Sequence, residues 1–118
     1  MLGDLNDYLE DDDQGKTGIE ELVRWEQVEN TVERRPEDDR WTHFFKGNRR
    51  CGIPQEYRQL DYILLSRSLA DTNTGLPLIE RRGSPKRAEK DRGPRFPGVG
   101  WDAPKASDHC PVVMDLTV

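Results

Sequence analysis

Three short stretches place chemically active side chains beside apolar, strand-like neighbours. Near the C-terminus, Asp108 and His109 precede a β-branched run that predicts a buried strand. Near the N-terminus, Asp4 and Asn6 stand two positions apart, so in an extended segment their side chains face the same side. Asp61 opens a third apolar run. One imidazole, several carboxylates and one carboxamide at strand ends are the groups that metal-assisted phosphoester hydrolysis uses.

The run from Leu60 to Ser66 is the clearest strand in the sequence. Apolar residues stand on both of its alternating faces, which is typical of a central strand. A carboxylate among such neighbours costs several kcal/mol unless it has a partner. His109 is one candidate partner of Asp61, because a carboxylate that orients an imidazole is a common catalytic device. Alternatively, Asp61 lies near the strand's end and binds a backbone amide or an arginine, and spacing alone leaves both readings open.

Local patterns predict the remaining elements. Thr17 and Glu20 have the spacing of a capping box, so residues 18–33 are predicted as an amphipathic helix. The other predicted segments, in chain order, are a strand over 41–45, a hairpin loop over 46–56, a turn over 67–76, a strand over 78–82 and a long irregular loop over 83–104.

Composition predicts one lean domain with an uneven charge distribution. Hydrophobic residues make up 33% and charged residues 35% of the 118, so the core must be small. The net charge of −5 hides an acidic stretch over 1–40, with fourteen acids against five bases, and a basic one over 81–95, with seven bases against two acids. The basic segment could follow a phosphate backbone, or it could be a solvated loop.

The cysteines and the second histidine give weaker signals. Cys51 and Cys110 lie far apart, which favours a reduced compartment or burial over a disulfide framework. A zinc site made of both cysteines with His43 and His109 has suitable atoms but no ligand-pair spacing, and we disfavour it. We expect His43 to be a strand residue with a structural hydrogen bond, and a second functional imidazole is the less favoured alternative. We expect no membrane span and find no targeting signal, which leaves localisation open between cytoplasm and secretion.

The three stretches together resemble the C-terminal motifs of the endonuclease/exonuclease/phosphatase superfamily. Residues 3–6 are similar to its Gly-Asp-x-Asn motif, residues 59–66 to the Leu-Asp-Tyr strand of its abasic-endonuclease branch, and residues 107–112 to its Ser-Asp-His-x-Pro-Val signature. The motifs occur in the family's order. They cover nearly the whole chain but only the second half of the family's domain.

The resemblance implies an α/β (α+β) fold, namely part of a four-layered α/β sandwich of the DNase I-like type. We therefore expect residues 1–118 to be the C-terminal portion of such a domain, with its N-terminal half absent. The implied activity is metal-dependent phosphodiester hydrolysis of the nuclease type. The alternatives are a catalytically inactive remnant and a small binding module that uses the basic loop over 81–95.

The resemblance also implies roles for individual residues. Asp4 would position or deprotonate the attacking water, and Asn6 would donate a hydrogen bond to a phosphate oxygen. His109 would stabilise the phosphoryl oxygen or act as a base, with Asp61 orienting it, and Asp108 would lie next to the metal.

The implied cofactor is Mg²⁺ or Mn²⁺, expected only with the complete domain, because the family's first half supplies its principal glutamate ligand. The expected partners are a phosphoester substrate, with DNA as a candidate, and the missing N-terminal half of the domain.

Overall fold

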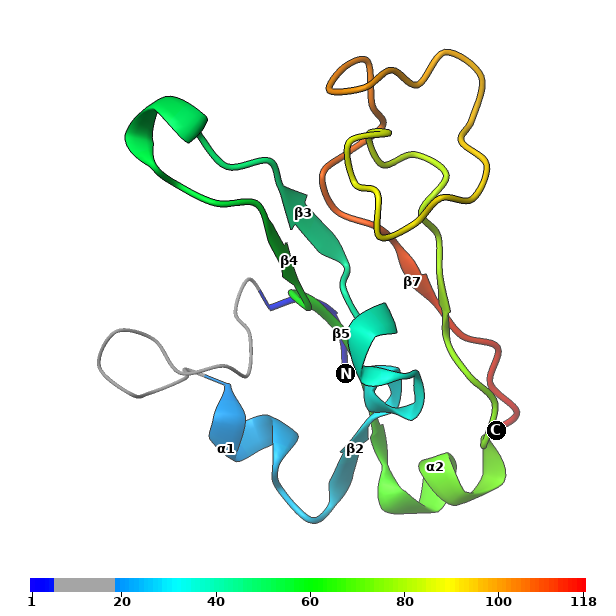
Figure 1. The fold of residues 1–118 in the computed structure, drawn as a ribbon. Helices are drawn as coiled ribbons and strands as arrows, with labels where there is room; N and C mark the ends of the chain where they lie inside the picture. The colour runs from blue at the N-terminus through cyan, green and yellow to red at the C-terminus, as the bar shows by residue number, and fades with distance from the viewer. Residues whose placement is uncertain (6–18) are drawn as a thin grey trace.

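The computed structural model describes residues 1–5 and 19–118, which form small β-sheets and short helices (Figure 1). The elements are β1 (Leu2–Asp4), α1 (Glu20–Val23), β2 (Val28–Asn30), η1 (Thr31–Arg34), η2 (Glu37–Asp39), β3 (His43–Phe45), η3 (Arg49–Cys51), β4 (Glu56–Arg58), β5 (Asp61–Ser66), α2 (Arg67–Thr72), β6 (Leu78–Ile79) and β7 (Val112–Val113), where η marks a 3₁₀ helix. The mixed α and β composition confirms the expected fold class at this coarse level. No helix in the described part of the chain has both the length and the apolar character that crossing a bilayer requires.

Strand β5 is central, as its apolar faces predict. It pairs antiparallel with β1 on one side and with β2 on the other. Tyr62 and Leu64 pack on one face against Val23 of α1, whereas Ile63 and Leu65 pack on the opposite face with α2. Both faces of β5 are therefore buried, which fixes its register and the position of its first residue.

The prediction of one long helix over 18–33 is wrong for the part that the structure describes. Only Glu20–Val23 is α-helical, and Val28–Asn30 extends as β2 along the second half of β5. The proposed N-cap Thr17 lies outside the described residues. The backbone groups along that edge of β5 need partners, and β2 supplies them, so tertiary pairing overrides the local helical pattern.

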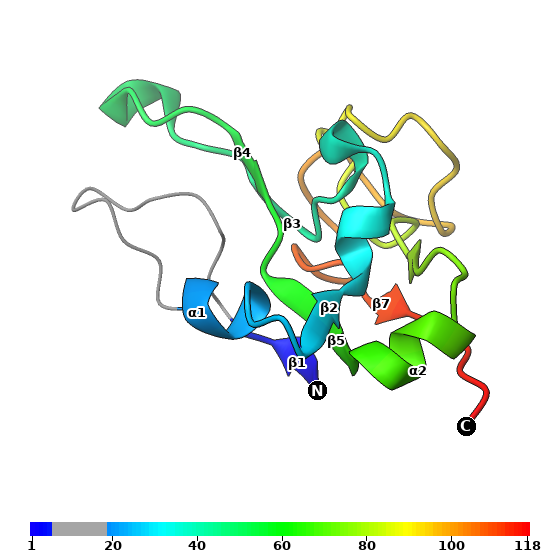
Figure 2. The same cartoon turned by 90° about the horizontal axis from the view of Figure 1, so that it is seen from below.

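Strands β3 and β4 form a separate hairpin, and the predicted strand over 41–45 is confirmed for its last three residues. The hairpin loop contains η3 and closes through hydrogen bonds between Asn48 and Ile53. Gly47 has a φ of +75°, and a Cβ there would collide with the Ile53 carbonyl, so this position requires glycine. The hairpin projects away from the main sheet (Figure 2).

The segments after β5 differ from their predictions in length. Arg67–Thr72 is helical rather than a turn, with the Ser66 hydroxyl accepting from the Leu69 N–H at its N-terminus. The strands predicted over 78–82 and after His109 shrink to the two-residue pair β6 and β7. Val113 is 49% exposed and Val112 only partly buried, so the prediction of a buried strand is wrong here.

Residues 83–104 are irregular, as predicted, but the loop is tied down by arginines. Besides Lys90, which lies over the Tyr57 ring, four of the seven bases between 81 and 95 make hydrogen bonds within the fold. They are Arg81 with Asp39 and the Trp41 carbonyl, Arg82 with Glu80, Arg87 with Asp102, and Arg95 with the carbonyls of Ser84, Ala88 and Asp91. We call residues 80–102 with Asp39 the arginine-tied loop.

Candidate active site

The predicted site residues meet where three segments converge. Asp4 ends β1 and lies directly opposite Asp61, the first residue of β5. His109 follows the long loop and forms an antiparallel bridge with His43 on β3. These four side chains and Asp108 are called the imidazole cluster below.

Asp61 is the hydrogen-bond partner of His109, as one of the two sequence hypotheses requires. The Asp61 Oδ2 atom lies 2.9 Å from Nδ1 of His109. With the proton on Nδ1, the carboxylate accepts the bond and Nε2 of His109 carries its lone pair. The Asp61 side chain is only 18% exposed, so this bond also satisfies the charge that burial would otherwise destabilise.

Asp4 lies on the other side of the same imidazole. Its Oδ2 atom is 4.0 Å from Nε2 of His109. Two carboxylates that face each other across neighbouring strands repel, and a cation between them relieves this repulsion. Burial of His109 opposes its protonation, but the hydrogen bond to Asp61 and the charges of Asp61, Asp4 and Asp108 outweigh it, so the pKa of His109 is raised above 6.5.

His43 belongs to the cluster, although sequence reasoning favoured a purely structural role. Its Nε2 atom lies 3.5 Å from Oδ2 of Asp108, and its ring centroid is 4.8 Å from that of His109. His43 lies close to these residues because β3 pairs with the segment that carries Asp108 and His109. That pairing joins residues more than sixty positions apart, so no local signal in the sequence could reveal it.

Thr42 is a positioning residue that sequence reasoning missed. Its fully buried hydroxyl accepts from the backbone N–H groups of Leu60 at 3.0 Å and Asp61 at 3.1 Å. Ser107 has a similar role at the other segment, where its hydroxyl accepts from the His109 N–H at 3.0 Å. The strand preference of Thr42 was visible in the sequence, but its hydrogen bonds depend on the tertiary fold.

The two cysteines do not join the cluster. Asn6 lies outside the described residues. Cys51 is exposed at the hairpin loop, and Cys110 is buried, where desolvation raises the pKa of its thiol to about 12. Cys110 is therefore no nucleophile at neutral pH, and the two cysteines do not assemble a zinc site with the histidines.

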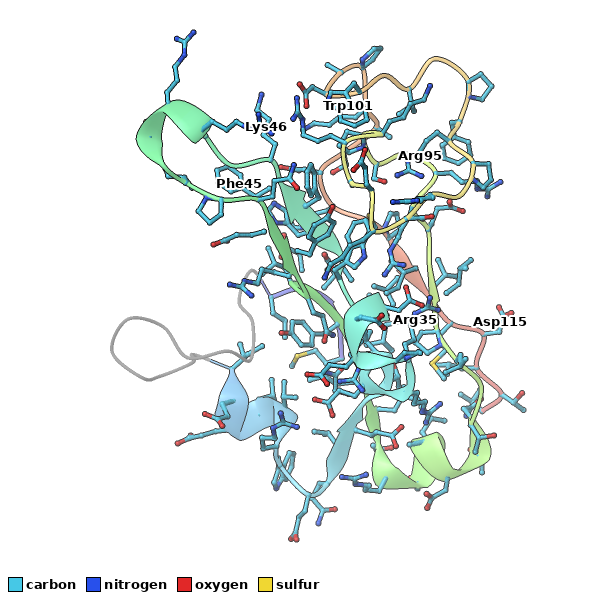
Figure 3. All side chains as sticks on the ribbon, viewed as in Figure 1. Arg35, Phe45, Lys46, Arg95, Trp101 and Asp115 are labelled. Atoms are coloured by element: carbon cyan, nitrogen blue, oxygen red, sulfur yellow. The ribbon has the colours of Figure 1, made fainter. Side chains whose placement is uncertain are left out.

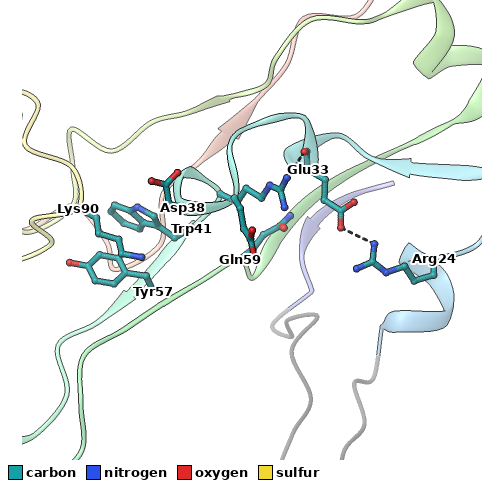
Figure 4. A pocket seen from close by; sticks show the side chains of 9 residues that line it. Arg24, Glu33, Asp38, Trp41, Tyr57, Gln59 and Lys90 are labelled. Carbon is teal, nitrogen blue, oxygen red and sulfur yellow. Dashed lines mark hydrogen bonds and ion pairs between the residues drawn. The ribbon is translucent and has the colours of Figure 1, made fainter.

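Two surface hollows, among several in the described part of the chain, contain no residue of the imidazole cluster. One is lined by basic residues of the hairpin loop and by Arg87, with Lys46 and Trp101 on its two sides (Figure 3). The other, of about 310 Å³, lies beside Trp41 and Tyr57 (Figure 4). Its charged residues include the Arg24–Glu33 ion pair, and no residue of the imidazole cluster lines it.

Among the described residues, two groups of three side chains could hold a cation. They are Asp4, Asp61 and His109, and His43, Asp108 and His109, with the ligand atoms of each group within 4.8 Å of one another. No family model, curated protein or solved structure matches this chain.

Proposed function

We propose that this chain is the C-terminal portion of a metal-dependent phosphoesterase of the nuclease type and carries part of its active site. The supporting observation is that His109 is held by Asp61 at one nitrogen while its other nitrogen faces Asp4. For the fold, we propose part of a four-layered α/β sandwich of the DNase I-like type. A β5 strand covered on both faces, with helices outside, is consistent with such layers.

In this proposal, His109 stabilises the phosphoryl oxygen. Protonated at both nitrogens, it donates from Nδ1 to Asp61 and from Nε2 to the substrate, and its raised pKa favours that charged form. Asp61 keeps the ring oriented because its own position is fixed by β5 and by the Thr42 hydroxyl. Asp4 orients the attacking water or accepts its proton.

Asp108 is the residue that would hold Mg²⁺ or Mn²⁺. Its carboxylate is about half exposed, at 49%. Mg²⁺ is commonly bound by one or two carboxylates together with water and substrate phosphates, so this donor set fits. When bound, the ion supplies charge that neutralises the phosphate oxygens in the transition state.

Hydrolysis by the full-length protein, in which this chain is joined to the N-terminal half that the proposal requires, tests the proposal. The substrates are a DNA duplex with one abasic site and an activated phosphodiester, each incubated with Mg²⁺ and with a chelator. We expect Mg²⁺-dependent cleavage that His109→Ala lowers by roughly 10²–10³-fold, the range for removing one oxyanion donor. Asp4→Asn should abolish it, because the amide cannot accept a proton from water.

Asp61→Asn serves as the matched control for the dyad. If Asp61 only positions the imidazole, Asp61→Asn should lower the hydrolysis rate less than His109→Ala does. Equal reductions in rate would mean that the pair acts as a unit. Circular dichroism of each variant checks that the fold is retained. Full activity in His109→Ala or Asp4→Asn, or no cleavage of either substrate by the wild-type full-length protein, would overturn the proposal.

A further inference from the structure

We propose that His43, Asp108 and His109 form a binding site for a transition-metal dication of the Zn²⁺ class. This site differs from the oxygen-ligand site for Mg²⁺ in its donor chemistry and shares only His109 and Asp108 with the proposed phosphoesterase residues. It rests on the geometry of three side chains and does not depend on hydrolytic activity.

The backbone holds the two imidazoles together. His43 and His109 are directly opposed in an antiparallel bridge, which places their side chains on the same face. The bridge is flanked by hydrogen bonds from the Phe44 N–H to the Asp108 carbonyl at 3.0 Å and from the Cys110 N–H to the Thr42 carbonyl at 2.6 Å. Backbone pairing therefore holds the two imidazole rings close together.

The donor atoms are close to the spacing that a tetrahedral ion requires. Metal–ligand bonds of about 2.0–2.2 Å put two neighbouring donors roughly 3.3–3.5 Å apart. Nε2 of His43 and Oδ2 of Asp108 are 3.5 Å apart, and all three donors lie within 4.8 Å of one another. Rotation of the half-exposed Asp108 carboxylate and a small tilt of the His109 ring would bring all three donor atoms to this spacing.

Asp61 prepares His109 as a metal ligand. A ligating imidazole usually donates its other ring N–H to a carboxylate, which fixes the tautomer and makes the ligating nitrogen more basic. Asp61 at 2.9 Å from Nδ1 is in this position. The lone pair of Nε2 is then available on the side of the ring away from Asp61.

Two imidazole nitrogens and one carboxylate oxygen select the class of ion. Such nitrogen-containing sets suit Zn²⁺ and its neighbours, whereas Mg²⁺ prefers oxygen ligands only. Three protein ligands leave a fourth position for water, as in zinc sites that are open to solvent. The partial exposure of all three side chains allows an ion to enter.

Co²⁺, which takes the same ligands as Zn²⁺ and is visible by its absorption, tests the site in the full chain. We expect one equivalent to give the strong visible bands of tetrahedral cobalt, Zn²⁺ to displace it, and millimolar Mg²⁺ to leave it unchanged. His43→Phe keeps a ring against His109 but removes the donor, so it should abolish these bands. Asp61→Asn should weaken the affinity by roughly 10–100-fold, the usual effect of losing a ligand's carboxylate partner.

Cys51→Ser is the control, because this exposed thiol is remote from the cluster and its loss should leave the titration unchanged. Calorimetric Zn²⁺ titration of Asp108→Asn provides a second ligand variant in case His43→Phe fails to fold. Wild-type affinity in a folded His43→Phe or Asp108→Asn variant, thiolate-to-cobalt bands, displacement by Mg²⁺, or absence of stoichiometric binding would each overturn the site.

Discussion

The arginine-tied loop and the imidazole cluster are both rich in charge, but their carboxylates have different partners. In the loop, the Asp39 carboxylate accepts hydrogen bonds from the guanidinium groups of Arg81 and Arg35, and the Asp102 carboxylate accepts two from Arg87. In the cluster, Asp61 and Asp108 pair with imidazoles. The two regions therefore contain similar acids but differ in the base that faces them.

The two kinds of base suit different roles, the guanidinium groups a structural one and the imidazoles a chemical one. A guanidinium stays charged at any physiological pH and offers donors in a fixed plane, so it can hold a loop without a hydrophobic core. An imidazole can gain or lose a proton near neutrality, and its lone pair can bind a metal. The arginines consequently hold residues 80–102 in place beside the turn that carries His109, while the histidines carry the reactive groups.

The largest expected effect on stability comes from breaking the loop's central contact. Arg81 is buried, pairs with Asp39, lies over the Trp41 ring and donates to the Trp41 carbonyl. Arg81→Ala removes these contacts and leaves Asp39 with Arg35 alone, and we expect a loss of about 2–4 kcal/mol in the free energy of unfolding, measured by urea denaturation. Arg82→Ala is the matched control, because its pair with Glu80 is solvent-exposed and should leave the midpoint near that of the wild type. Equal midpoints for the two variants would contradict the structural role of Arg81.

A smaller loss of stability is expected when the uncharged Thr42 hydroxyl beside the imidazole cluster is removed. Thr42→Val keeps the shape of the side chain but leaves the N–H groups of Leu60 and Asp61 without their acceptor. We expect a loss of about 1–3 kcal/mol, the cost of buried unsatisfied donors. Thr42→Ser retains the hydroxyl and serves as the control for the same urea experiment. If Thr42→Ser is as unstable as Thr42→Val, packing of the methyl group matters instead of these hydrogen bonds.

The smallest expected effect is a pH dependence of the folding stability that arises from Asp39 in the arginine-tied loop. Burial opposes ionisation of Asp39, but hydrogen bonds and charges from Arg81 and Arg35 outweigh it, so the pKa of Asp39 lies below 3.8. The unfolded chain then binds more protons in this range. The contribution of ionised Asp39 to the free energy of unfolding is fully present above pH 3.8 and is lost as the pH falls through the lowered pKa of Asp39. Urea midpoints of the wild type and Asp39→Asn should therefore converge in acid, and a constant difference down to the acid limit would refute this assignment.

Several elements near the site were predictable because their signals are local. The alternating apolar residues of 60–66 are enough to define a buried central strand, and a carboxylate at its start must have a partner. The glycine and asparagine content of 46–56 similarly predicts the hairpin loop. Over 18–33, by contrast, the apolar spacing predicts a helix, yet Val28–Asn30 pairs with β5 because a strand edge there offers backbone hydrogen bonds.

The sequence by itself determined the central strand, the choice of Asp61 and His109 as a candidate pair, and the irregular course of residues 83–104. Only the tertiary structure decided that His43 joins this pair, that Thr42 fixes the start of β5, and that most of the loop's arginines are used internally. The physical reason is the range of the interactions. Apolar periodicity and turn preferences act between near neighbours, whereas strand pairing and arginine–carboxylate contacts join residues that the fold alone brings together.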